Sequence, residues 1–342
     1  MSCIDICGLA FIGDDFRAEN AEIIIENGVI KEINPVKKSS ENWIVPAFFN
    51  AHTHIADAAA CDIKVDRPLA ELVAPPNGLK HRILRATPDN ELVNIMKSTI
   101  KFMKNTGTLG FADFREGGVH GVNLLKDAAD STMHTVILGR DGGEMISDGL
   151  GLSSAKGNEA EREAVKRARD AGKIFSVHAG EADAKDIQYA FDLNPDFIIH
   201  AVNFSDKNIK EAADKDIPIV ICPRSNWTLN AADSSNKPPV RKLLDAGCRL
   251  FLGTDNAMFV EPDMAAECAF LYTVYKLSPP EIMKAACGGF EIAGSSSIIK
   301  VGAPANITVL KKDESASMTK DPLKTLFMRR SKVIKTISSM AV

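Results

Sequence analysis

Two histidines stand one residue apart at the end of an apolar segment near the start of the chain. His52 and His54 follow the apolar run 44–49. Successive side chains of a strand point to opposite faces, so a strand here turns both imidazoles the same way. Imidazole nitrogens bind zinc and similar divalent ions, and a catalytic zinc site uses about three protein ligands plus a position for water. The pair therefore predicts half of a metal site, and the other ligands have to come from later in the chain.

Three more polar residues stand at the ends of later apolar runs. They are His178, His200 and Asp255. A single histidine at a strand end is usually a hydrogen-bonded structural residue, but four histidines and an aspartate in such positions together favour a shared site. Asp255 suits a metal ligand that also accepts a hydrogen bond from the attacking water. His200 is either a further ligand or a group that holds the water or the charge developing at the attacked carbon.

A glutamate follows His178 by three residues, in the segment His178-Ala179-Gly180-Glu181. A turn allowed by Gly180 brings the Glu181 carboxylate within reach of a water on the metal. There it can take a proton from the water and pass it to a leaving amine, first as general base and then as general acid. The alternative is an ordinary surface glutamate at the start of the next helix, and the local sequence does not distinguish the two.

Eight short apolar runs, separated by helical segments, must position these side chains. The runs are 44–49, 108–114, 135–139, 149–152, 174–178, 197–200, 218–222 and 249–255. Eight strand–helix units over about 255 residues match the size of a (β/α)8 TIM barrel, in which the C-terminal strand ends converge on one mouth that holds the active site. A doubly wound open α/β sheet is the alternative, but no Gly-x-Gly-x-x-Gly follows the first strand.

The two ends of the chain are expected to form a second, smaller domain. Asn27-Gly28, between two strand-like stretches, is a strong hairpin signal. A lone hairpin cannot bury its apolar face, and the stretches 305–310 and 332–337 are suitable partners for it. We therefore predict a small β-sandwich domain from residues 1–45 and 303–342, and the barrel domain from residues 46–302.

The composition argues against several classes of function. The formal net charge of the 342 residues is −4, which does not suit a protein that binds a nucleic acid polymer or a membrane surface. The seven cysteines are scattered without zinc-finger spacing, which indicates reduced thiols in a cytoplasmic protein. The N-terminus lacks the pattern of a signal peptide, and no apolar run reaches the length of a membrane span. The signature of cytidine-type zinc deaminases, His-x-Glu with Pro-Cys-x-x-Cys, is also absent.

Six segments form a joint pattern that is more specific than any one of them. They are 46–54 (PAFFNAHTH), 178–181 (HAGE), 222–226 (CPRSN), 239–247 (PVRKLLDAG), 253–255 (GTD) and 305–310 (ANITVL). In this order they resemble the metal-dependent amidohydrolase superfamily, from roughly residue 20 to the C-terminus. Within it the chain looks like the aminohydrolase branch of cytosine, guanine and S-adenosylhomocysteine deaminases and triazine chlorohydrolases.

The resemblance implies one divalent metal ion, zinc or iron. Its ligands would be His52, His54, His178 and Asp255. Glu181 would move protons, and His200 with Asp255 would orient the attacking water. Binuclear relatives use a carboxylated lysine at the end of strand four, and the run 149–152 has no lysine at its tip.

The reaction implied by the same resemblance is hydrolytic deamination of a small amino-substituted heterocycle. A purine, a pyrimidine or a pterin-like base or nucleoside fits this description. Hydrolysis of an amide or a halide by the same site is the alternative, and a non-catalytic scaffold barrel is less favoured. Residues 55–60 lack the Met-rich and Arg-Gly ending common in the family, so the substrate class stays open. The oligomeric state is open too, with a homodimer as one option.

Residues that follow other strand ends are candidates for substrate contacts. Arg115 and Arg140 each follow an apolar run, and a guanidinium there can hold a carboxylate or a phosphate through two hydrogen bonds. A structural ion pair is the alternative for either arginine. His81 lies in the long loop after the first strand, and such loops often close over a barrel mouth.

Overall fold

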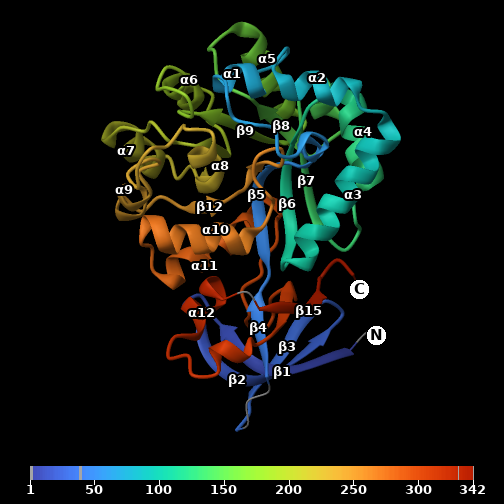
Figure 1. Cartoon of the computed structure of the whole chain (residues 1–342), viewed down its shortest axis with the longest axis vertical. Coiled ribbons are helices and arrows are strands. Elements are labelled where there is room, and N and C mark those ends of the chain that lie inside the picture. Colours follow the sequence, from blue (N-terminus) through green and yellow to red (C-terminus); the bar gives the residue numbers. More distant parts are fainter. Residues whose placement is uncertain (1–2, 38–40, 330, 342) are drawn as a thin grey trace.

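The structure, a computed structural model, describes residues 3–37, 41–329 and 331–341. The chain has a larger part, in which helices surround a parallel sheet, and a smaller part built on a second sheet (Figure 1). The two parts are joined by a nearly continuous extended segment, because β4 (Asn42–Pro46) of the smaller sheet leads directly into β5 (Phe48–His54) of the larger one.

The larger sheet is parallel and curls back on itself. Its strands, in spatial order, are β12 (Leu250–Leu252), β11 (Ile219–Ile221), β10 (Phe197–His200), β9 (Ile174–Ala179), β8 (Gly149–Leu152), β7 (His134–Gly139), β6 (Thr108–Arg115), β5 and β13 (Asp255–Asn256). The run 250–256 closes the ring, because β12 pairs with β11 while β13 pairs with β5. Each of the eight predicted runs overlaps one or more of these strands. The sheet and its helices therefore form the predicted TIM-like barrel.

Helices with one apolar face cover the outside of this sheet (Figure 1). They include α3 (Asp89–Asn105), α4 (Gly118–Ala128), α5 (Glu159–Asp170), α6 (Ile187–Asp192), α7 (Asp206–Asp214), α9 (Val240–Asp245), α10 (Met264–Phe270) and α11 (Pro279–Gly288). Helix α3 buries a stripe of side chains spaced three or four apart: Leu92, Met96, Ile100 and Met103. The Asn158 side chain caps α5 by accepting a hydrogen bond from the backbone N–H of Glu161, which explains where that helix begins.

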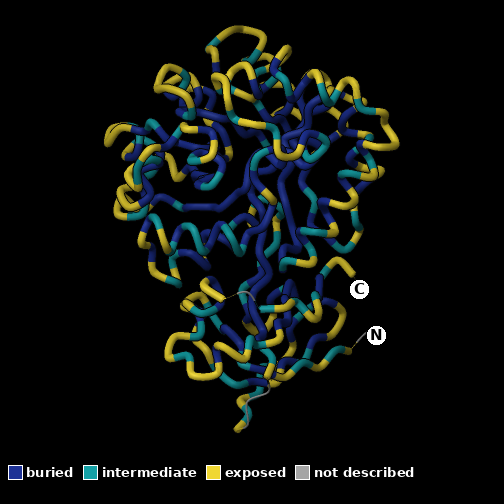
Figure 2. The backbone as a smooth tube through the Cα atoms, viewed as in Figure 1, coloured by how far each residue is buried: buried dark blue, intermediate teal, exposed yellow. Residues whose placement is uncertain are grey.

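Burial follows the same division. The barrel strands are buried along their lengths, whereas exposed residues gather on the outer helices and loops (Figure 2). Three short helices lie outside the regular alternation of strand and helix: α1 (Leu69–Val73) and α2 (Leu79–Ala86) between β5 and α3, and α8 (Pro223–Thr228) directly after β11. Among the described residues, no helix is both long and apolar enough to cross a bilayer.

The smaller sheet brings both ends of the chain together, as predicted. Its order is β15 (Lys332–Ile337), β14 (Ile307–Lys311), β4, β1 (Cys3–Ile12), β2 (Arg17–Glu26) and β3 (Val29–Pro35), with α12 (Pro322–Met328) beside it. The predicted hairpin turn is present between β2 and β3, and Asn27 and Gly28 both have positive φ, at 48° and 73°.

The β-sandwich expected for the smaller part is not confirmed. The described strands here form one six-stranded sheet, whose core includes Ile23, Ile44 and Ile307. The domain boundaries given above, at residues 45/46 and 302/303, stay a prediction. Residues 1–2, 38–40, 330 and 342, which all fall within the predicted small domain, lie outside the described residues.

Candidate metal centre

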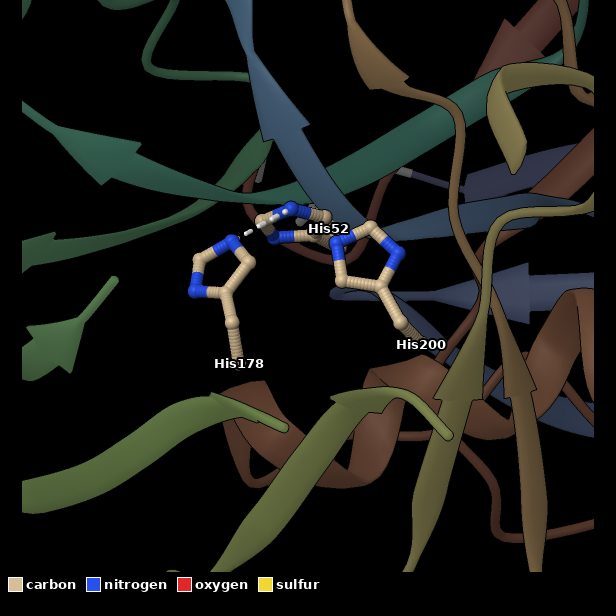
Figure 3. A group of neighbouring side chains, drawn as sticks. All are labelled: His52, His178 and His200. Carbon is tan, nitrogen blue, oxygen red and sulfur yellow. Dashed lines mark hydrogen bonds between the residues drawn. The ribbon is translucent and has the colours of Figure 1, made fainter. Parts of the chain in front are cut away.

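The five polar residues predicted at strand ends lie together at the barrel mouth. His52 and His54 belong to β5, His178 to β9, His200 ends β10, and Asp255 begins β13. All five are buried. Figure 3 shows the imidazoles of His52, His178 and His200, which come from different strands and converge on one space.

The nitrogen and oxygen atoms that face this space have the spacing of metal ligands. His52 Nε2 lies 3.1 Å from Asp255 Oδ1 and 3.2 Å from His178 Nε2. His54 Nε2 lies 3.6 Å from the same Asp255 oxygen. Ligands of a tetrahedral zinc at 2.0–2.1 Å are about 3.3 Å apart, so a divalent ion fits between these atoms with little movement.

The other ring nitrogens of two of these histidines are held by backbone carbonyls. His178 Nδ1 donates to the carbonyl oxygen of Leu152 at 2.7 Å, and His54 Nδ1 to that of Phe114 at 2.9 Å. These hydrogen bonds leave the Nε2 lone pairs aimed at the centre. Burial lowers the pKa of His54 to about 3 and that of His178 well below its usual value. Both imidazoles are therefore neutral at pH 7, which is the form that binds a metal.

Asp255 is held as a carboxylate in the middle of this group. Burial raises its pKa, but the neighbouring imidazoles of His52 and His200 outweigh burial and keep the pKa well below the usual value. The Ser225 hydroxyl donates to Asp255 Oδ2 at 2.5 Å, which adds a charge-assisted hydrogen bond. Asp255 and His200 both have positive φ, at 64° and 78°, and such backbone strain in non-glycine residues is typical of functional sites.

Glu181 and His200 face each other beside the metal ligands. Glu181 Oε2 lies 3.6 Å from His200 Nε2, and atoms of Glu181, His200 and Asp255 all lie within 4.8 Å of one another. The Asn226 side-chain amide donates to His200 Nδ1 at 3.1 Å, which leaves the proton of His200 on Nε2, toward Glu181. Gly180, with φ of 68°, makes the turn expected before Glu181. Burial, followed by the Asp255 charge, raises the pKa of Glu181 to about 8.

The segment Cys222-Pro223-Arg224-Ser225-Asn226 supports the centre from one side. Pro223 begins α8, and Ser225 and Asn226 hold Asp255 and His200 as described. Arg224 Nε donates to the buried Glu267 carboxylate at 2.8 Å and so ties this turn to α10. The sequence motif identified the segment, but not the two hydrogen bonds that it makes to the site.

The three residues predicted to contact substrate line one cavity of about 400 Å³, whose wall includes Glu116 but none of the five residues of the centre. His81 Nε2 donates to the Val73 carbonyl at 3.1 Å. Arg115 forms ion pairs with Glu116 at 2.6 Å and Asp113 at 3.3 Å. Arg140 lies 3.3 Å from Glu116. Arg115 therefore has the role given above as the alternative to substrate binding, that of a partner in structural ion pairs.

A group of buried charges beside His54 was missed by sequence reasoning. Lys80 Nζ lies 2.8 Å from Asp57 Oδ2 and 2.7 Å from Glu116 Oε1, and that Glu116 oxygen is 2.9 Å from His54 Nδ1. Lys80 and Asp57 belong to the segment between β5 and α3, where neither stands in a motif or at a strand end. No signal in the sequence indicated that they would meet.

Comparisons with known proteins identify the family and the fold of the chain. Residues 43–339 match the amidohydrolase family. The chain is 30% identical over 351 residues to a Methanothermobacter thermautotrophicus protein named "Putative aminohydrolase", covering 89% of this chain and 90% of that protein. The fold of this chain is similar to that of atrazine chlorohydrolase from Arthrobacter aurescens, solved in complex with zinc. The TM-score is 0.81 at 16% identity, and the match covers 98% of this chain and 94% of that one.

A second solved structure with the same fold is an adenosine deaminase from Xanthomonas campestris with bound zinc. The TM-score is 0.78 at 15% identity, and the match covers 98% of this chain and 91% of that one. The family match spans both the barrel strands and the metal-binding cluster at their ends. The chain belongs to the amidohydrolase family and is a hydrolase.

Proposed function

We propose that the protein catalyses the hydrolytic deamination of a small amino-substituted heterocycle, using one bound zinc ion. The proposed ligands are His52, His54, His178 and Asp255. The observation that carries the proposal is the position of Glu181, a non-ligand carboxylate that faces His200 beside the ligands. This arrangement provides a proton carrier at the place where water would attack and an amine would leave.

Each group has a distinct part in the proposed reaction. A bound divalent ion lowers the pKa of a coordinated water, and that is the chemistry it supplies. The charge of a bound divalent cation would lower the pKa of Glu181 from about 8, so that its carboxylate could take a proton from the attacking water and deliver it to the ring nitrogen. Glu181 would then take the second proton from the hydroxyl added to the ring carbon and give it to the amine, which leaves as ammonia while the ring carbonyl forms. The N–H on His200 Nε2 donates to the oxygen that adds to the ring carbon. Asp255 accepts a hydrogen bond from the attacking water and keeps it in line with that carbon.

The part of the substrate away from the reacting carbon is proposed to enter the cavity that contains His81, Arg115 and Arg140 in its wall, since Glu116 in the same wall lies 2.9 Å from His54 Nδ1. Arg140 is the best placed for direct contact, because its only ion pair among the described residues is the 3.3 Å approach to Glu116. A guanidinium has five N–H donors, so most of those on Arg140 remain for a ligand. Arg115 is engaged with Asp113 and Glu116 and would act mainly by shaping the wall.

Ammonia release by the zinc-loaded protein tests the proposal. The panel contains aminopurines, aminopyrimidines, pterins and their nucleosides, and Glu181→Gln is the matched variant. We expect release from one class, and a loss of roughly 10²–10⁴-fold in the variant, the usual size of a general acid–base contribution. The zinc content of the variant should not change, because Glu181 is not among the proposed ligands.

The other outcomes of this assay point to other functions. Zinc bound at one equivalent with no ammonia from any compound would favour hydrolysis of an amide or a halide. The structural similarity to an atrazine chlorohydrolase is the observation that favours this second candidate. A protein that binds no metal and releases no ammonia would support the scaffold interpretation instead.

A further inference from the structure

Three buried charged residues form a compact group on the outer side of His54. We call this group, Asp57, Lys80 and Glu116, the Lys80 cluster. Their exposed fractions are 1%, 4% and 7%. Burying charged side chains costs free energy unless each charge is paired, so three buried charges at one place indicate a specific role.

The cluster has the geometry of a cation site that already contains a cation. Ligand atoms of His54, Asp57 and Glu116 all lie within 4.8 Å of one another. The Lys80 ammonium contacts both carboxylates, at 2.8 Å and 2.7 Å. A zinc ion binds carboxylate oxygens at 2.0–2.2 Å, so the two oxygens would need to close by about 0.7 Å each around a metal.

The two carboxylates depend on Lys80 to different degrees. Glu116 also forms ion pairs with Arg115 at 2.6 Å and Arg140 at 3.3 Å. For Asp57, Lys80 is the one ion-pair partner within the described part of the chain. Burial raises the pKa of Asp57 to about 7 even beside Lys80, so without the ammonium this carboxyl would either take up a proton or bind another cation, for which its geometry with Glu116 suits a divalent ion.

We infer that the Lys80 ammonium fills a latent second metal site, made of the Asp57 and Glu116 carboxylates beside His54, and keeps this site closed to metal. The inference rests on the proposed function in one respect: it takes the first zinc ion to be bound at His54 Nε2, whereas the Lys80 cluster lies beside His54 Nδ1. In the latent site the two carboxylates bind the ion.

This arrangement gives a physical reason for a single metal ion at the barrel mouth. Lys80 comes from α2, which packs on the 3-10 segment η1 (Ile55–Ala60) that carries Asp57. The helix thus delivers a permanent positive charge to a place where a mobile ion could otherwise bind. The charge also balances Glu116 next to His54, so the cluster is complete without any metal.

The metal content of Lys80→Met tests the inference. Wild-type protein, Lys80→Met and the double variant Lys80→Met/Asp57→Asn are dialysed against buffered free zinc, and zinc per chain is measured by elemental analysis. We expect one zinc in the wild type, two in Lys80→Met, and one in the double variant, which lacks a ligand of the latent site. One zinc in Lys80→Met would overturn the inference.

Thermal unfolding provides a second measurement for the case in which the loss of the Lys80 charge destabilises the fold. Lys80→Met should unfold at a lower temperature than wild type without zinc, and excess zinc should raise its unfolding temperature more than it raises that of the double variant. If Lys80→Met fails to fold with zinc while the double variant folds, zinc does not replace the ammonium and the inference is wrong. Failure of the proposed function is distinguishable, because a lack of ammonia release does not change these zinc counts, and a lack of the first zinc would appear as no zinc in the wild type.

Discussion

Ser225→Ala should weaken zinc binding although the serine is not a proposed ligand. The Ser225 hydroxyl is fully buried and donates to Asp255 Oδ2 at 2.5 Å, while the other oxygen of Asp255 faces the imidazoles. Without the hydroxyl, Asp255 loses the hydrogen bond that holds its carboxylate in the plane needed for the metal. The substitution removes one oxygen atom and adds no bulk, so the surrounding backbone has no reason to move.

The expected size follows from the kind of hydrogen bond. A hydrogen bond to a charged group contributes about 1.5–3 kcal/mol to stability, and its short length places this one among the stronger examples. Loss of a residue that orients a metal ligand typically costs 10–100-fold in metal affinity, or about 1.4–2.7 kcal/mol. We therefore expect the zinc dissociation constant of Ser225→Ala to rise by at least tenfold.

A matched serine elsewhere in the barrel separates the metal effect from general destabilisation. Ser176 in β9 is also fully buried, and its hydroxyl donates to the backbone carbonyl of Phe197 at 2.8 Å. Ser176→Ala should lower the unfolding temperature slightly, since a neutral hydrogen bond contributes about 0.5–1.5 kcal/mol. It should leave zinc affinity unchanged, because its partner is not in the metal centre.

The assay is competition for zinc against a chelator of known affinity, with thermal unfolding of each protein in parallel. Equal zinc affinities for Ser225→Ala and wild type would refute the argument that this hydroxyl orients Asp255. Equal losses of affinity in both serine variants would also refute it, because the effect would then come from reduced stability alone.

Three further predictions concern stability and metal dependence. A Cβ on Gly121 would lie 1.8 Å from the Glu116 carbonyl oxygen, so Gly121→Ala must push α4 away from Glu116. The free energy of unfolding, measured in urea, should fall by about 1–3 kcal/mol. An unchanged urea midpoint would contradict this packing. Hydrogen bonds from Arg241 lower the pKa of Glu281 to about 2, so the pair stabilises the fold above pH 4.5 and loses this effect as the pH falls toward 2. Arg241→Met should flatten that part of the acid unfolding curve by only about 0.5–1 kcal/mol, because half of the arginine side chain is exposed; a steeper curve would argue against the pairing. Removal of zinc with a chelator should lower the unfolding temperature. Adding zinc at about 100 times its dissociation constant should raise the free energy of unfolding again by roughly 2.7 kcal/mol. An unfolding temperature that changes with neither treatment would mean that the folded state binds no zinc.

The sequence by itself was enough to predict the barrel and the convergence of its polar strand ends. The reason is that both depend on local patterns with one geometric outcome. Alternation along β5 places His52 and His54 on one face, and parallel strands in a closed sheet bring their C-terminal ends to one mouth. His178 and Asp255 therefore meet them although more than a hundred residues separate each from the pair.

Only the tertiary structure decided which partners the remaining charges have. Arg115 stands at a strand end as a substrate-binding arginine would, yet it is paired with Asp113 and Glu116 inside the wall. Lys80 reaches Glu116 because α2 packs against the barrel mouth, and no periodicity in the sequence reports that contact. Local patterns indicate the face on which a side chain lies, whereas an ion pair depends on the distance between two segments that only packing brings together.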